Sequence, residues 1–140
     1  MRLVWVRHGL AQDREDPTCP PDAERPLTEV GIRKTWRAMC GLATLLPERP
    51  VFWTSPYLRA RQTAALARRA WCDRLPVAAR SRGQRDWVET ELLLPDGCPR
   101  TLLRHIGSQS AAALVLVGHC PQLDAALALL CGHPSPRSEL

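Results

Sequence analysis

The sequence predicts an α/β fold, a three-layer α/β/α arrangement around a mainly parallel sheet. Short segments rich in β-branched and aromatic residues alternate with longer segments of helical periodicity, which is the pattern of βαβ units. The short segments are apolar at consecutive positions, as expected for parallel strands that are covered on both faces. The thirteen prolines lie at or near the ends of these segments. The 140 residues are therefore expected to form one domain.

Three segments are predicted to be strands of this sheet. They are residues 3–6 (Leu-Val-Trp-Val), 51–54 (Val-Phe-Trp-Thr) and 114–117 (Leu-Val-Leu-Val). Each is short and bounded by turn residues, as buried parallel strands are. Residues 76–79 are a fourth candidate.

Four helices are predicted between and after these strands. Residues 29–46 carry apolar side chains at helical spacing and follow Thr28, a residue type that caps helices well. A second helix is predicted to have Ser55 as its N-cap and a proline at its first position. A short helix is predicted over residues 100–106, and the last is expected after Pro121.

Composition and charge exclude several classes of protein. With 45% hydrophobic and 24% charged residues the chain has ordinary globular composition. The longest apolar runs hold seven residues, whereas a membrane-spanning helix needs about 20. No secretory signal is recognised, so we expect a cytoplasmic protein without a membrane partner. The net charge of +5 comes from arginines spread along the chain, which argues against nucleic acid as a partner.

The six cysteines do not form a metal-binding motif. The two closest in sequence are eleven residues apart, so neither a C-x-x-C pair nor zinc-finger spacing is present. Without a secretory signal, we expect the cysteines to be reduced and to fill small apolar spaces.

The carboxyl ends of the predicted strands carry the residues best suited to chemistry. Arg7 and His8 follow the first strand, Arg59 lies in the helix after the second, and His119 follows the last. Since ligands of parallel sheets bind at this edge, we expect these side chains to converge. Arginine forks and a helix N-terminus bind phosphate oxygens, so the sequence predicts an anion site. A zinc site on His8, His119 and Cys120 is the competing interpretation.

Four sequence blocks, in order, resemble the histidine phosphatase superfamily, which has the phosphoglycerate-mutase-like fold. The blocks are Val6-Arg7-His8-Gly9, then Arg25-Pro26-Leu27-Thr28 with Gly31, then Ser-Pro-Tyr-Leu-Arg-Ala-Arg-Gln-Thr-Ala at 55–64, then Val117-Gly118-His119-Cys120-Pro121. The resemblance extends over residues 2–132. The small size and the Arg-Pro-Leu-Thr block look most like the SixA-type phosphohistidine phosphatase branch.

This resemblance implies a phosphatase that needs neither a metal ion nor another cofactor. His8 would be the nucleophile, attacking phosphorus to form a phosphohistidine that water then hydrolyses. Arg7, Arg59 and His119 would hold the phosphoryl oxygens and stabilise the transition state, in agreement with the general demands of phosphoryl transfer. Arg25 would be a further substrate-binding residue. The non-attacking ring nitrogen of His8 is expected to donate to a backbone carbonyl.

The general acid is the part of the predicted site that stays open. Larger family members use a carboxylate to protonate the leaving group, and Asp86, Glu89 and Glu91 lie in the corresponding stretch. Glu91 gives the best alignment and is our candidate. An imidazole leaving group departs more readily than an alkoxide, so a phosphohistidine substrate needs only a weak acid or none.

The expected substrate is a phosphohistidine displayed on another protein, because the chain has no segment long enough for a lid. Arg25, Arg61, Arg82 and Arg85 are candidates to guide an acidic partner. The alternatives are a small-molecule phosphomonoesterase and a catalytically silent phosphohistidine-binding module. Family members usually continue past the last helix into one or two more strands, which we expect to be absent here. We expect a monomer.

Overall fold

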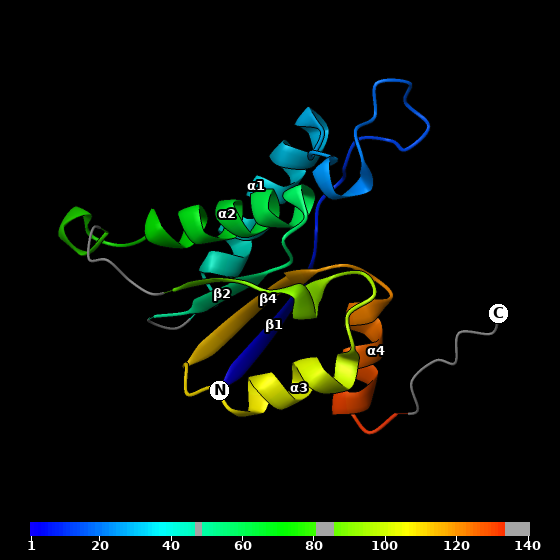
Figure 1. Cartoon of the computed structure of the whole chain (residues 1–140). Coiled ribbons are helices and arrows are strands. Elements are labelled where there is room, and N and C mark those ends of the chain that lie inside the picture. Colours follow the sequence, from blue (N-terminus) through cyan, green and yellow to red (C-terminus); the bar gives the residue numbers. More distant parts are fainter. Residues whose placement is uncertain (47–48, 81–85, 134–140) are drawn as a thin grey trace.

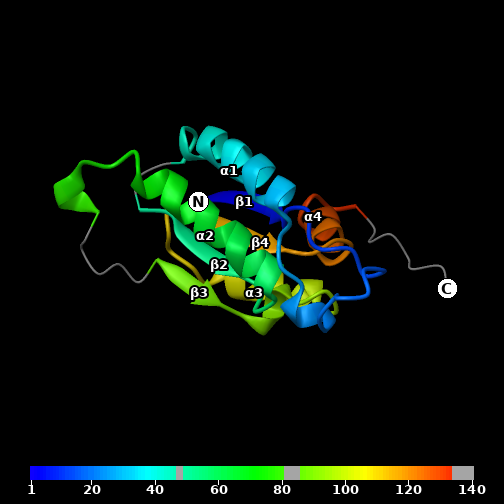
Figure 2. The same cartoon turned by 90° about the horizontal axis from the view of Figure 1, so that it is seen from above.

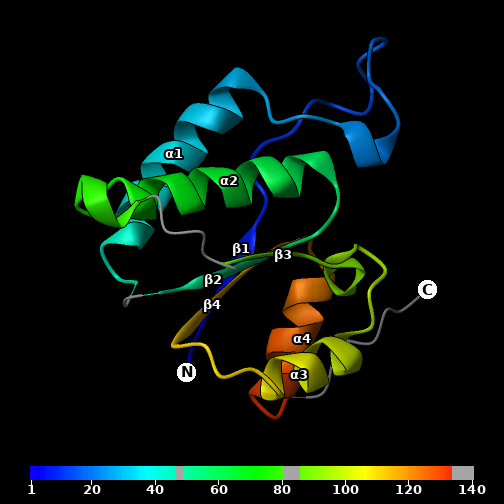
Figure 3. The same cartoon turned by 60° about the vertical axis from the view of Figure 1, so that its left-hand side comes forward.

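The computed structural model describes residues 1–46, 49–80 and 86–133 and has three layers (Figure 1). The strands are β1 (Arg2–Arg7), β2 (Val51–Thr54), β3 (Trp87–Glu89) and β4 (Ala113–Gly118). The helices are α1 (Glu29–Ala43), α2 (Leu58–Cys72), α3 (Pro99–Gly107) and α4 (Gln122–Leu130), with short 3-10 helices η1 (Asp22–Glu24), η2 (Val77–Ala79) and η3 (Glu91–Leu93). Helices α1 and α2 cover one face of the sheet, and α3 and α4 cover the other (Figures 1 and 3).

The sheet is parallel at each strand pair, in the order β1-β4-β2-β3. The central strand β4 is buried along its whole length, as expected for a strand covered on both faces. Its register with β1 runs from Arg2 opposite Ala113 to Arg7 opposite Gly118. His8 and His119 therefore leave the sheet side by side. The predicted three-layer fold with a mainly parallel sheet is confirmed.

The two faces of the sheet form separate cores because side chains alternate along each strand. Val115 and Val117 of β4 pack with α1 and α2, whereas Leu114 and Leu116 pack with α3 and α4. A stripe of alanines on α2 packs against the sheet, and Figure 2 shows from above that α2 runs across it. The buried members of this stripe are Ala60, Ala64, Ala67 and Ala70.

Most predicted elements are present, and their ends differ by a few residues. The N-cap of α1 is Thr28, whose Oγ1 accepts a hydrogen bond from the backbone N–H of Gly31 at 2.9 Å, as predicted. The helix ends at Ala43 rather than at residue 46. The short helix α3 and the last helix α4 also lie where the sequence predicts them.

Two predictions about elements are wrong. Residues 76–79 do not form a strand but contain η2, and the fourth strand is β3, which pairs with β2 over only three residues. Helix α2 begins at Leu58 with Tyr57 as its N-cap, not directly after Ser55. The Ser55 side chain is fully buried and is used elsewhere, as described below.

All six cysteines lie in the described ranges and none forms a disulfide there. Cys40, Cys98 and Cys131 are exposed, so the expectation that the cysteines fill apolar spaces is wrong for these three. In the same ranges, no helix is long and apolar enough to cross a membrane. The segment in which further strands of the family would begin, 134–140, lies outside the described residues.

Candidate active site

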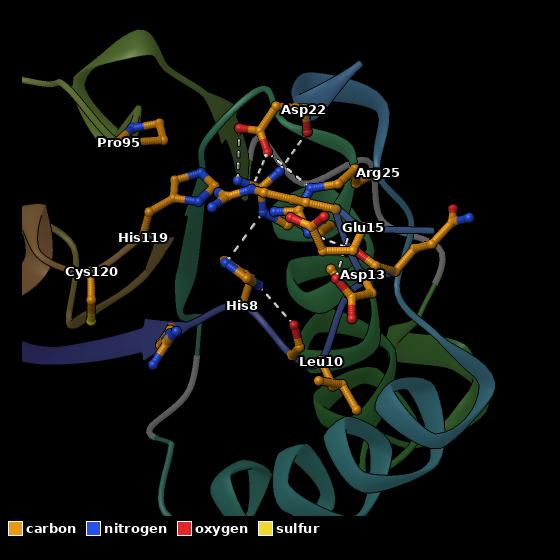
Figure 4. Close-up of a pocket in the computed structure, with 15 residues that line it drawn as sticks. His8, Leu10, Asp13, Glu15, Asp22, Arg25, Pro95, His119 and Cys120 are labelled. Atoms are coloured by element: carbon orange, nitrogen blue, oxygen red, sulfur yellow. Dashed lines mark hydrogen bonds and ion pairs between the residues drawn. The ribbon is translucent and has the colours of Figure 1, made fainter. Parts of the chain in front are cut away.

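A cavity of about 890 Å³ opens at the carboxyl edge of the sheet (Figure 4). The residues predicted for the anion site, Arg7, His8, Arg59 and His119, all line it, and so does Arg25. The remaining lining residues come mostly from the segment that follows β1: Gly9, Leu10, Ala11, Gln12, Asp13, Arg14, Glu15 and Asp22, with Pro95 and Cys120. The parallel register of β1 and β4 thus brings the predicted residues together.

His8 is held as a neutral side chain with one ring nitrogen free of a proton. Its Nδ1 lies 2.7 Å from the carbonyl oxygen of Gly9, so Nδ1–H donates to the backbone as predicted. Burial is the main cause that lowers the pKa of His8 below 6.5; the Gly9 bond opposes it, and Arg59 and Arg7 lower it further. Nε2 is therefore unprotonated, and it accepts a hydrogen bond from Arg59 Nε at 3.3 Å.

His119 is more deeply buried than His8 and is fixed by a serine. Its side chain is 2% exposed, and Nε2 lies 2.8 Å from the hydroxyl oxygen of Ser55. Burial, followed by the charge of Arg59, lowers the pKa of His119 to about 3. Its ring lies 5.1 Å from the ring of His8 and 5.2 Å from that of Tyr57. His119 is therefore a neutral hydrogen-bonding group beside His8.

Arg59 enters the cavity from the first turn of α2 and is 2% exposed. Its Nη1 donates to the backbone oxygen of Asp22 at 2.6 Å, and its Nη2 donates to Asp22 Oδ2 at 3.3 Å. The guanidinium also stacks over the Tyr57 ring, 5.0 Å from its centroid. Burial lowers the pKa of Arg59 and Asp22 opposes this. An arginine stays charged in such a setting, so it provides a fixed cation next to His8.

Asp22 is a residue of this site that the sequence did not indicate, as is Ser55. Its Oδ1 accepts from Arg25 Nε at 2.9 Å and from Arg14 Nε at 3.3 Å. Although burial raises the pKa of Asp22, its contacts with Arg25, Arg59 and Arg14 outweigh burial and lower the pKa below 3.8. Arg25 also donates to the backbone oxygen of Gln12 at 2.7 Å. The spacing of Asp22 and Arg25, three residues apart, is the signal that predicts their ion pair.

None of the three candidate general acids lines the cavity. Glu91 is exposed in η3, and Glu89 is exposed at the end of β3. Asp86 is buried and paired with Arg68, with contacts of 2.9 and 3.0 Å. The role assigned to Glu91 therefore stays a prediction. The carboxylates that do line the cavity are Asp13, Glu15 and Asp22, with Asp13 and Glu15 on the opposite side of His8 from His119 in Figure 4.

Of the arginines predicted to guide a partner, Arg25 lines the cavity, whereas Arg61 does not. Arg61 is exposed and donates to the backbone oxygen of Pro56 at 3.0 Å. Arg82 and Arg85 lie outside the described residues.

The zinc interpretation finds no support in the described part of the chain. There, no three His, Cys, Asp or Glu side chains are grouped as metal ligands would be. His119 and His8 instead use ring nitrogens for Ser55, Gly9 and Arg59.

Comparison with known proteins agrees with this geometry. Residues 3–82, more than half of the chain, match the sequence profile of the histidine phosphatase superfamily (branch 1). An uncharacterized protein of Picosynechococcus sp. is 36% identical over an alignment of 126 residues, and the alignment covers 88% of this chain and 68% of that protein.

Two solved structures have the same fold. The protein histidine phosphatase SixA complexed with tungstate superposes with a TM-score of 0.76 at 24% identity, covering 97% of this chain and 81% of that one. The alpha-ribazole phosphatase from Shigella flexneri superposes with a TM-score of 0.66 at 20% identity, covering 96% of this chain and 82% of that one. At these identities the structures establish the fold, whereas the profile match over more than half of the chain establishes the family: the chain belongs to the histidine phosphatase superfamily (branch 1).

Proposed function

We propose that this protein is a phosphatase that works through a phosphohistidine intermediate on His8. Membership of the superfamily supports phosphatase activity. The observation that carries the proposal is the state of His8: Nδ1–H donates to the Gly9 carbonyl, so the lone pair is on Nε2, which lies in an arginine-lined cavity and accepts a long hydrogen bond from Arg59 Nε at 3.3 Å. An unprotonated nitrogen in such a field is a nucleophile for phosphorus.

The proposed reaction has two displacements at phosphorus. In the first, His8 Nε2 attacks phosphorus as the bond to the leaving group breaks, and the leaving group takes up a proton. In the second, water attacks the phosphohistidine, inorganic phosphate departs, and His8 is regenerated. Arg7, Arg59 and His119 would stabilise the phosphoryl oxygens in both steps, and the two arginines would supply the charge that a metal ion supplies in other phosphoryl-transfer enzymes.

We further propose that the substrate is phosphohistidine on a protein, as in the SixA-type branch. The similarity to the SixA structure supports this assignment. So does the exposed position of Glu91 outside the cavity, because an imidazole leaving group departs without a strong general acid.

A small-molecule phosphomonoesterase is the second candidate, and one observation favours it. Asp13 and Glu15 line the cavity, and either carboxylate has the chemistry of a general acid for an alkoxide leaving group. The similarity to an alpha-ribazole phosphatase points the same way. The two candidates differ in the leaving group, so rates on a phosphoramidate and on an alkyl phosphate separate them.

The test is single-turnover mixing with a ³²P-phosphohistidine protein and, in parallel, with a ³²P-labelled alkyl phosphate. Wild type should acquire an acid-labile, alkali-stable label from the phosphohistidine protein and release phosphate. The His8→Ala variant should do neither. The matched control is His105→Ala, since His105 is an exposed histidine of α3 that does not line the cavity.

Each other outcome assigns a different function. Label and phosphate release from the alkyl phosphate alone would establish the phosphomonoesterase. Binding of the phosphohistidine protein without transfer or release would identify a phosphohistidine-binding module.

A further inference from the structure

We propose that Asp22 is a positioning residue that holds the guanidinium of Arg59 next to His8, and that Arg25 acts through Asp22 rather than on the substrate. This inference rests on the proposed function, because it assigns roles within the same site. It differs from the assignment that the family resemblance implies, in which Arg25 is a substrate-binding residue.

The guanidinium of Arg59 is held at three nitrogens. Nη1 and Nη2 donate to the backbone oxygen and to Oδ2 of Asp22, at 2.6 and 3.3 Å, while Nε faces His8 Nε2 at 3.3 Å. A planar group gripped along one edge cannot rotate about its own axis without breaking both contacts. Each terminal nitrogen still has a second hydrogen for a phosphoryl oxygen. Asp22 thus fixes the direction in which Arg59 offers its donors.

Asp22 needs such support itself, because η1 is only three residues long. Arg25 supplies it: Nε binds Asp22 Oδ1 at 2.9 Å, and Nη1 binds the backbone oxygen of Gln12 at 2.7 Å. Arg25 is 8% exposed, with both contacts directed at the segment that follows β1. Its described hydrogen bonds therefore link Asp22 to Gln12, which lies earlier in the same segment; Figure 4 shows Arg25 beside Asp22.

A carboxylate among arginines has a second possible role, as an internal anion that occupies the place of phosphate. The geometry points to positioning instead. Asp22 contacts the edge of Arg59 formed by Nη1 and Nη2, which lies opposite Nε, and Nε is the nitrogen that faces His8. A phosphoryl group on His8 Nε2 would take the place of the contact with Arg59 Nε, on the side of the guanidinium away from Asp22. The two roles predict opposite effects on anion binding, so they can be separated.

The first test compares Asp22→Asn with Glu24→Gln. Glu24 is an exposed carboxylate of the same 3-10 helix, so its variant makes the same charge change nearby. We expect Asp22→Asn to weaken vanadate binding by about 10- to 100-fold, the scale of a misplaced catalytic group. The affinity for inorganic phosphate, which does not resemble the transition state, should fall less. Glu24→Gln should change the affinity for vanadate and the affinity for phosphate by no more than about 2-fold.

The second test asks whether Arg25 acts through Asp22. Arg25→Lys keeps the charge but not the fork that reaches Gln12 and Asp22 together. Arg25→Lys should also weaken vanadate binding. The double variant Asp22→Asn/Arg25→Lys should lose less binding free energy than the sum of the losses in the two single variants. Circular dichroism and thermal melts confirm folding; if Asp22→Asn does not fold, Arg25→Lys carries the test alone.

Tighter binding of both anions by Asp22→Asn would overturn the proposal and identify an internal competitor. Unchanged binding, or fully additive losses in the double variant, would also overturn it. Because vanadate binding is measured without turnover, these outcomes stand apart from whether any phosphohistidine substrate is hydrolysed.

Discussion

His8 and His119 lie side by side, yet the protein holds them differently. Burial lowers the pKa of both below 6.5, that of His119 to about 3. An attacking nitrogen must be unprotonated, so activity should fall where His8 gains a proton. We expect kcat/KM to be constant above pH 6.5 and to fall with an acid limb below 6.5. The pH dependence of kcat/KM can be measured with a small phosphoramidate as substrate. An acid limb with its midpoint at or above pH 6.5 would contradict the assignment of His8 as the nucleophile.

Ser55 sets the orientation of His119. Its buried hydroxyl lies 2.8 Å from His119 Nε2, and removing it leaves a buried nitrogen without that partner. We expect Ser55→Ala to lose about 1–3 kcal/mol of unfolding free energy and to lower kcat/KM by about 10-fold as the ring is released. Urea unfolding and steady-state kinetics measure the two effects. Wild-type values for both would show that Ser55 does not hold His119.

At the scale of elements, α1 and the segment after β1 meet at a glycine. A Cβ at Gly31 would lie 2.1 Å from the backbone oxygen of Leu10, whereas one at Gly41, in the same helix, would meet nothing within 4 Å. Gly31→Ala should therefore destabilise the protein by more than about 2 kcal/mol, since backbone must move. Gly41→Ala should stabilise it by about 0.5–1 kcal/mol. Denaturant midpoints of the two variants test this; equal midpoints would mean that the contact with Leu10 adjusts freely.

The same scale shows what the sequence can predict. Arg7 ends β1, His8 follows it and His119 follows the buried strand β4, and runs of apolar residues mark both strands locally. The strand β3 is three residues long, too short for a periodic pattern, so it was missed. Asp22 and Ser55 were missed as site residues because their roles depend on partners far along the chain. Asp22 meets Arg59 and Ser55 meets His119 only after the sheet has formed.

At the scale of the molecule, the site is built where both cores end. β1 and β4 bring His8 and His119 to one edge of the sheet. Helix α2 packs on one face of the same strands and brings Arg59 to that edge. Arg59 and His119 are each 2% exposed, and His8 is half-buried beside them. The folded protein therefore keeps both histidines neutral, and its unfolding free energy must depend on pH as a result.

Protonation of these histidines links the site to the stability of the whole fold. An unfolded histidine binds a proton near pH 6.5, whereas folded His119 does so only near pH 3 and folded His8 below 6.5. Unfolding thus takes up protons in this range, so the stability present above pH 6.5 is lost as the pH falls. Asp22 and Asp16, whose pKa values are lowered from 3.8, add their own losses only at more acidic pH.

We therefore expect the unfolding free energy to decrease between about pH 7 and pH 5, before carboxylates contribute. Urea unfolding at several pH values measures this slope. His119→Gln removes one of the two groups and should flatten the slope, while His105→Ala, on the exposed side of α3, should leave it unchanged. A slope of zero in wild type, or one that His119→Gln leaves intact, would show that folding does not exclude the proton from His119.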